Sequence, residues 1–371
     1  MASEAAIPKQ ERPQNVSGSL TLFSQVTEAQ QSAGSAIQVP ERPSDPMLSR
    51  AELKFHAMFY PLGFAVEIAT NDRAVLAAAN ESWGGMNERY VKAPLLLEVI
   101  VTGDEADVCP PAPVARARGH LFSMVADAEN QIICDLTAGV GFICIGQVAL
   151  RHSNYLRYHY LEAAVYTLIG ALRVTPLHAA CVSRNGHGLL FCGNSGAGKS
   201  TLAYACARAG WTYTSDDATY LLRGTLPNVI GNSQKVRFRP SAQELFPELA
   251  GRDLTPRAEG KPSIEVPSLE LPNLITSDEA TIHSIVFLNR RRSAVAELLP
   301  LPRASAIQYF DEALFPDHEV HARQMAALDA LATARIYELQ YDNLGPAIDC
   351  LERLIGSGDS FNSPGGGGGR K

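Results

Sequence analysis

The feature that most constrains this chain is the run GNSGAGKS at residues 193–200. It fits G-x-x-x-x-G-K-[ST], a loop in which backbone N–H groups surround phosphate oxygens, the lysine reaches the outer phosphates and the hydroxyl reaches Mg²⁺. The apolar run 188–192 precedes it, and residues 201–209 have helical composition. The order strand, glycine loop, helix places an anion at a helix N-terminus. We therefore predict a nucleotide-phosphate loop made of Gly193, Asn194, Ser195, Gly196, Ala197, Gly198, Lys199, Ser200 and Thr201.

Composition limits the partners that the chain is expected to have. Its 371 residues suit two domains of about 150 residues each and a tail. Its 32 Lys and Arg are scattered among 39 Asp and Glu, so we expect neither a nucleic-acid nor a membrane partner. The seven cysteines show no C-x-x-C motif and no histidine spacing typical of zinc sites. Because we find no secretory leader and no long apolar stretch, we expect a cytoplasmic protein.

The first half of the chain reads as an arm followed by a small domain. Residues 1–48 are rich in Ser, Gln, Pro and Glu, which predicts a disordered arm with at most a short strand at 19–23. Residues 51–173 form an α+β domain in which we find no motif that carries chemistry. Its expected strands lie at 54–70, 95–101, 131–136 and 141–148, and its expected helices lie at 72–82 and 154–172.

The second half, 174–356, contains the glycine loop, and we expect it to be an α/β domain. Asn-Gly at 185–186 predicts a hairpin turn between the strands 174–183 and 188–192. The glycine-rich end at 357–371 is expected to be disordered. The other expected strands are 211–214, 218–222, 234–239, 281–289, 294–299 and 334–341, and the other expected helices are 304–310, 319–333 and 344–355.

Two acids and one histidine are the further candidates for chemistry. Asp216 and Asp217 lie seventeen and eighteen residues after Lys199. If they continue a strand, their side chains point to opposite faces, so one would serve metal and the other the attacking hydroxyl, as phosphoryl transfer requires. A solvated turn is the alternative. His178, which we expect inside the strand 174–183, is by itself more typical of a core residue.

Four landmarks together resemble the C-terminal catalytic domain of HPr kinase/phosphorylase. They are HAACV at 178–182, GLLFCGNSGAGKST at 188–201, Gly210 and SDD at 215–217, and they cover about 40 residues. The resemblance implies a mixed sheet similar to that of phosphoenolpyruvate carboxykinase, with ATP and Mg²⁺ as cofactors. It also implies that His178 helps to handle phosphate, Lys199 neutralises phosphate charge, Asp216 is the base toward a serine hydroxyl, and Ser200 and Asp217 hold Mg²⁺.

Downstream the sequence departs from that family. Its second signature, an acidic and glycine-rich segment, is not found, and residues 231–240 read GNSQKVRFRP. We therefore leave the phosphorylase reaction, HPr as acceptor and a hexamer out of the prediction. Arg237, Arg239, Lys261 and the arginines 290–292 are candidates for a phosphate clamp, although 235, 237 and 239 also alternate like the exposed face of a strand.

The sequence thus predicts an ATP-dependent kinase that acts on a serine of a small protein or peptide, with homo-oligomer formation left open. A non-catalytic ATP sensor is the alternative from another class. A small-molecule kinase would share all the site residues and differ only in its acceptor pocket.

Overall fold

The structure, a computed structural model, describes residues 52–356 apart from 104–107, 256–261 and 293–294. The expected arm at 1–48 with its strand at 19–23, the tail at 357–371 and Lys261 lie outside the described residues. The described residues all belong to one unit, Ala51–Lys371. The division into two domains at residue 173 stays a prediction.

A seven-stranded sheet occupies the first part of the chain, in the order β1-β2-β3-β7-β6-β5-β4. β2 and β3 pair in parallel, as do β3 and β7, and the other neighbours are antiparallel. Expected strands are confirmed at β3, β6 and β7, and the run expected at 54–70 is divided between β1 and β2. The edge strand β4 and its neighbour β5 were not anticipated. β4 reads VARAR and is exposed along its whole length, so its alternation of Ala and Arg does not mark a buried face. The bounds are β1 Phe55–Phe59, β2 Phe64–Thr70, β3 Tyr90–Thr102, β4 Val114–Arg118, β5 Leu121–Val125, β6 Gln131–Asp135 and β7 Val140–Gly146.

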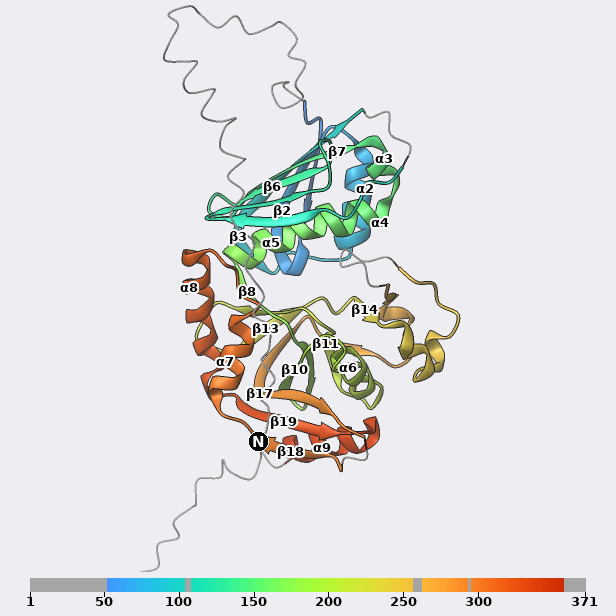
Figure 1. The fold of residues 1–371 in the computed structure, drawn as a ribbon, viewed down its shortest axis with the longest axis vertical. Helices are drawn as coiled ribbons and strands as arrows, with labels where there is room; N and C mark the ends of the chain where they lie inside the picture. Colours follow the sequence, from blue (N-terminus) through green and yellow to red (C-terminus); the bar gives the residue numbers. More distant parts are fainter. Residues whose placement is uncertain (1–51, 104–107, 256–261, 293–294, 357–371) are drawn as a thin grey trace, which may run out of the picture. The chain divides into compact units, whose positions relative to one another are not determined.

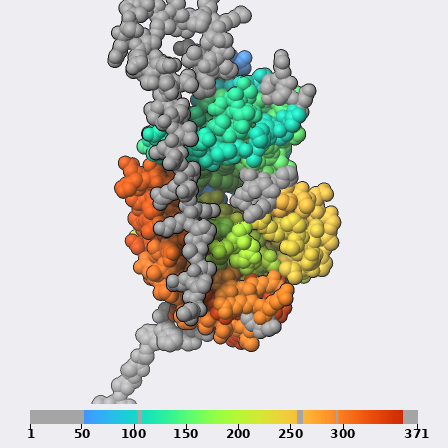
Figure 2. Space-filling model, in the orientation of Figure 1, coloured from blue at the N-terminus to red at the C-terminus, as the bar shows by residue number. Residues whose placement is uncertain are grey.

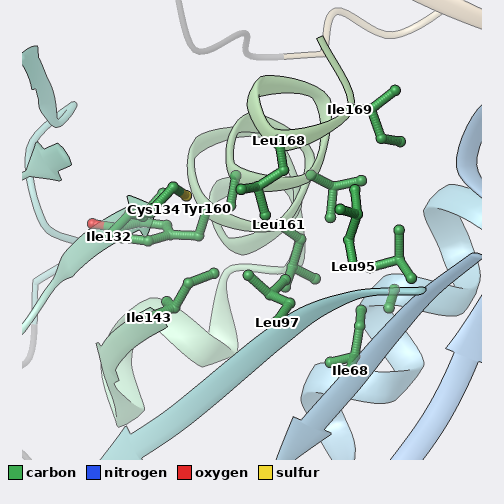
Figure 3. Close-up of a cluster of buried hydrophobic side chains, with 14 of the residues drawn as sticks. Ile68, Leu95, Leu97, Ile132, Cys134, Ile143, Tyr160, Leu161, Leu168 and Ile169 are labelled. Atoms are coloured by element: carbon green, nitrogen blue, oxygen red, sulfur yellow. The ribbon is translucent and has the colours of Figure 1, made fainter. Parts of the chain in front are cut away.

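Helices α2, Arg73–Trp83, and α5, Glu162–Leu172, pack against this sheet (Figure 1). Asp72 caps α2 by accepting a hydrogen bond from Ala74 N at 2.9 Å. Apolar side chains of the strands face those of α5 to form the core, as Figure 3 shows for Leu97 and Leu168. The single helix expected at 154–172 is wrong in one respect: α4, Ser153–Leu156, is joined to α5 by the π-helical segment η2, Arg157–Leu161.

A ten-stranded sheet follows, in the order β16-β11-β9-β10-β17-β13-β12-β8, with β19 beside β17 and β18 beside β19. β10 and β19 both pair with β17 in parallel and most other pairs are antiparallel, so the expected α/β class with a mixed sheet is confirmed. β13 and β16 were not anticipated. The bounds are β8 Val174–Leu177, β9 Ala180–Arg184, β10 His187–Cys192, β11 Thr212–Ser215, β12 Thr219–Leu222, β13 Asn228–Gly231, β16 Ile275–Thr276, β17 Glu279–Arg290, β18 Glu297–Pro300 and β19 Arg335–Tyr341.

Both faces of this sheet are covered by helices. In β10, Leu189 and Phe191 join the core under α6, Lys199–Arg208, and α9, Leu344–Gly356, whereas Leu190 and Cys192 join the core under α7, Arg303–Asp311, and η6, Leu328–Thr333. Burial on both faces explains why this strand reads as a continuous apolar run. Helix α8, His318–Ala327, ends in η6, so the helix expected at 319–333 is confirmed only in its first part.

A two-stranded ribbon, β14 Lys235–Phe238 and β15 Ile264–Pro267, lies outside the large sheet. The 3₁₀ turns η3 Pro240–Glu244, η4 Pro247–Leu249 and η5 Ser268–Glu270 accompany it, and they form the yellow surface of Figure 2. The Tyr204 ring of α6 packs edge-on against Phe238 and Phe246, with centroids 4.9 and 4.8 Å away. The ribbon is thereby held against the helix that follows the glycine loop.

Arg223 joins α5 to the strand that follows it. Its guanidinium donates hydrogen bonds to four carbonyl oxygens, those of Gly170, Ala171, Leu172 and Val174, at 2.8–3.3 Å. Burial lowers the pKa of Arg223 to about 10. Within the described residues, we find no helix with both the length and the apolar character needed to cross a bilayer.

Candidate functional site

The glycine loop connects the end of β10 to the start of α6, in the expected order of strand, loop and helix. Gly196 and Gly198 adopt φ of 90° and 98°, backbone conformations that side chains other than glycine rarely accept. The first hydrogen bond of the helix runs from Leu202 N to the Gly198 carbonyl at 2.8 Å. The N–H groups of residues 199–201 therefore precede the helix's own ladder and point toward the loop, where an anion is favoured.

The hairpin explains why His178 and the two acids lie near this loop. β9 is antiparallel to β10, and its first residue, Ala180, is opposite Phe191, so the residues before β9 lie at the loop end of the sheet. β11 is antiparallel to β9, and its last residue, Ser215, pairs with Cys181. The segment that follows β11 is delivered to the same edge.

His178 does not lie inside a strand, as expected, but in the two-residue break between β8 and β9. The apolar run 174–183 concealed this break because both strands are buried. β8 pairs with β12, whereas β9 pairs with β10 and β11, so the chain must cross between positions in the sheet at His178. The crossing directs the imidazole toward Lys199.

The Lys199 ammonium is the centre of the site. Its side chain is 5% exposed, and Nζ is 2.8 Å from the Gly193 carbonyl, 2.9 Å from His178 Nε2 and 3.5 Å from Asp217 Oδ1. An ammonium only donates hydrogen bonds, so Nε2 must accept, and His178 is then neutral with its proton on Nδ1. That Nδ1 lies 3.5 Å from Asp217 Oδ1. The side chains of Lys199, His178 and Asp217 thus lie together at the N-terminus of α6.

Asp216 and Asp217 lie in a bend after β11 rather than on a strand, which corrects the premise of the prediction. Their carboxylates nevertheless diverge. Asp217 faces Lys199, whereas Asp216 Oδ2 accepts a hydrogen bond from Arg237 N of β14 at 2.6 Å. The Ser200 hydroxyl donates to the Asp216 carbonyl at 3.2 Å, which ties the start of α6 to the bend.

Tyr309 of α7 is a further site residue that the sequence reasoning missed. Its hydroxyl accepts from Gly193 N at 3.1 Å and lies 2.8 Å from the His178 carbonyl and 2.9 Å from the Gly193 carbonyl. Burial raises the pKa of Tyr309 to about 12, so the hydroxyl keeps its proton. This hydroxyl fixes the first glycine of the loop against the backbone of His178. No local motif marks it, because α7 is more than 100 residues downstream.

His178, Lys199, Asp216 and Asp217 line a cleft of about 520 Å³. Arg239 and Arg290 add positive charge to its wall, and Arg239 donates to Ser195 Oγ at 3.0 Å. Phe238, Leu245 and Leu344 provide an apolar part of the lining. The cleft therefore combines a helix N-terminus, cationic side chains and an apolar wall, which suits a molecule that is anionic at one end and apolar at the other.

The residues present also fit Mg²⁺ and a nucleotide. Ser200 and the two carboxylates offer oxygen ligands, the type that Mg²⁺ prefers, and Mg²⁺ is usually held by one or two carboxylates together with phosphate. A Cβ on Gly198 would lie 3.0 Å from the Tyr341 hydroxyl, so a larger residue would crowd β19 as well as hold an unfavourable φ of 98°. Bound at this place, Mg²⁺ would neutralise phosphate charge.

Arg237 lies on the less buried face of β14, as the alternation predicted, but its side chain is only 28% exposed because it is ion-paired on that face. Its guanidinium pairs with Glu265 at 2.8 Å and Glu162 at 3.4 Å. Lys235 pairs with Glu265 at 3.0 Å, and Arg157 lies 3.7 Å from Glu162 and 3.9 Å from Glu265. Burial by itself would raise the pKa of Glu265, but the cations outweigh it and lower that pKa to about 2.

Comparisons with known proteins give little beyond this geometry. No family model and no curated protein matches the chain. Among solved structures, the Hpr(Ser) kinase/phosphatase from Coxiella burnetii is similar over 50% of this chain and 99% of its own, with a TM-score of 0.28 and 11% sequence identity. A similarity at this level carries no argument about activity, and the α/β class rests on the sheets described above.

Proposed function

We propose that this chain is an ATP-dependent phosphotransferase that transfers the γ-phosphoryl group to a serine hydroxyl of a small protein or peptide. The observation that carries the proposal is the convergence of Lys199, His178 and Asp217 at the N-terminus of α6, with mutual distances of 2.9–3.5 Å. The resemblance of residues 178–217 to the HPr serine kinase domain supports the same reading.

Each residue then has a defined part in the transfer. Loop N–H groups and Lys199 hold the β and γ phosphates, while Ser200 and Asp217 are the residues that would hold Mg²⁺. The oxygen of the acceptor hydroxyl forms a bond to the γ-phosphorus, and Asp216 takes the hydroxyl proton. At the same time the bond between the γ-phosphorus and the ADP oxygen breaks. His178 orients the transferred group through Lys199, whose ammonium lies 2.9 Å from its Nε2.

The test is transfer of label from γ-³²P ATP to serine peptides. Asp216→Asn should lower the rate by about 10²-fold or more, the contribution typical of a general base, and should keep most of the nucleotide affinity. Asp349→Asn on the exposed face of α9 is the matched control and should label normally. Equal labelling by the parent and Asp216→Asn would remove the base assignment.

A non-catalytic ATP sensor is favoured by one observation, the missing second signature at residues 231–240. In its place, Arg237 is held by the two carboxylates of Glu162 and Glu265. Release of ADP separates the two functions: a sensor binds ATP without turnover, whereas a phosphotransferase shows at least slow hydrolysis.

A further inference from the structure

A second pocket, of about 430 Å³, lies beside the cleft described above. Asp216 and Arg237 line both cavities, and no other described residue does. Asp216 therefore marks the boundary between the proposed nucleotide cleft and a separate space. The rest of this second lining comes mostly from the π segment, α5, and the strands β8 and β12.

The wall of this pocket is largely apolar, although the charged side chains of Glu162, Asp216, Lys235 and Arg237 also line it. Four rings line it, those of Tyr158, Tyr166, Tyr220 and Phe315. The Tyr166 and Tyr220 rings are stacked, with centroids 6.1 Å apart and planes 26° apart. Tyr166 accepts a hydrogen bond from Trp83 Nε1 at 3.1 Å, and Tyr158 donates to Glu265 Oε2 at 3.1 Å. The hydroxyls of Tyr158 and Tyr166 thus have protein partners, and the faces of these two rings offer the pocket apolar surface.

The volume of this pocket suits an acceptor larger than a serine side chain. The pocket falls within the range of about 300–1,000 Å³ typical of sites for small organic molecules. A serine side chain placed at Asp216 would leave most of that volume without contacts. A flat apolar group next to the hydroxyl would fill it and would contact the aromatic wall.

We propose that this pocket binds an aromatic or large apolar group that adjoins the acceptor hydroxyl. The inference rests on the proposed phosphotransferase function and names its substrate class: an alcohol carried beside a flat apolar group. In a peptide, this means a serine followed by an aromatic residue. The hydroxyl oxygen lies at Asp216, where its proton is taken up as the bond to phosphorus forms and ADP leaves.

The experiment compares two acceptors, acetyl-Ser-Phe-amide and acetyl-Ser-Gly-amide, with labelled ATP and Mg²⁺. We expect kcat/KM to be at least about tenfold higher for the Phe peptide, the discrimination that apolar pocket contacts usually give. A third reaction, with 2-phenylethanol as the acceptor, shows whether the enzyme phosphorylates a free alcohol or requires a peptide. A Phe-to-Gly ratio near one would overturn the pocket assignment and leave the transferase function intact, whereas absence of transfer to all three acceptors would overturn the function itself.

A filling variant tests the pocket directly. Ala163 lines it from α5, so Ala163→Phe should bring the ratio of the two peptides close to one. Ala77→Phe, on the exposed side of helix α2, is the matched control and should preserve the ratio.

Binding gives a readout that needs no turnover. Trp83 is in contact with Tyr166, so its fluorescence should respond to acetyl-Ala-Phe-amide in the parent and not in Ala163→Phe. An equal response in both proteins would place the peptide elsewhere and overturn the proposal.

Discussion

Replacing Asp217 by Asn should change ATP binding in opposite directions without and with Mg²⁺. The Asp217 carboxylate lies 3.5 Å from Lys199 Nζ, so a phosphate that reaches this ammonium also comes close to a negative charge. Two like charges about 4 Å apart repel by about 1 kcal/mol at the dielectric constant of water and by about 4 kcal/mol at an effective value of 20. Since the Asp217 side chain is 35% exposed, the lower figure applies. Asp217→Asn should therefore strengthen metal-free ATP binding by about 1 kcal/mol, or roughly fivefold.

With Mg²⁺ present, the sign should reverse. If Asp217 holds the metal, the amide supplies a weaker ligand without charge, and the Mg²⁺-dependent gain in ATP affinity should fall by at least about tenfold, a loss seen even for outer-shell partners of metal sites. Isothermal titration calorimetry with ATP, in EDTA and then in excess Mg²⁺, measures both effects on one protein.

Asp349→Asn removes the same charge from the exposed face of α9 and controls for the change in net charge. Its affinities should match those of the parent under both conditions. The reasoning fails if Asp217→Asn binds metal-free ATP no better than the parent, or if its gain from Mg²⁺ is unchanged.

Three further predictions follow from the loop and the ion pairs. Tyr309→Phe leaves the N–H of Gly193 without its partner, so the free energy of unfolding should fall by about 1–3 kcal/mol and calorimetry should show a lower melting temperature. An unchanged melting temperature would show that this contact is not made. Gly198→Ala must hold a side chain at φ 98° and 3.0 Å from the Tyr341 hydroxyl, so we expect about 1–2 kcal/mol of destabilisation and weaker ATP binding, and full affinity would refute the strain. Because the pKa of Glu265 is lowered from its ordinary 4.5 to about 2, its ion pairs stabilise the fold above pH 4.5 and lose that effect as pH falls toward 2. Urea titrations across this range should show that the free energy of unfolding depends less on pH for Glu265→Gln than for the parent. An equal dependence in the two proteins would contradict this assignment.

The local features of the glycine loop could be predicted from sequence because they depend on neighbours in the chain. β10, the loop and α6 are consecutive, and the Asn-Gly turn at 185–186 gives the hairpin its register, with φ of 52° and 80° at its two residues. That register brings the residues before β9 to the end of the sheet where the glycine loop lies. Turn chemistry and strand direction thus bring the segments that contain His178 and Asp217 to the loop end of the sheet. The direction of the two side chains depends on the break before β9 and the bend after β11.

Contacts between distant segments could not be predicted in this way. The break at His178 depends on which strands flank β8 and β9, and no residue within 174–183 marks it. Tyr309 reaches the loop from α7, and Arg237 finds its carboxylates on α5 and β15. A one-dimensional pattern read Arg237 as exposed because alternation reports which side of a strand a residue is on, and not what covers that side.

The Arg223 guanidinium has a consequence for how this chain can change in evolution. It binds carbonyls on both sides of the single residue that separates α5 from β8. One inserted or deleted residue at that joint would move Val174 by about 3.3 Å along the strand and out of its reach. Length variation among homologues should therefore be absent at this joint and concentrated in surface turns such as the one between β4 and β5.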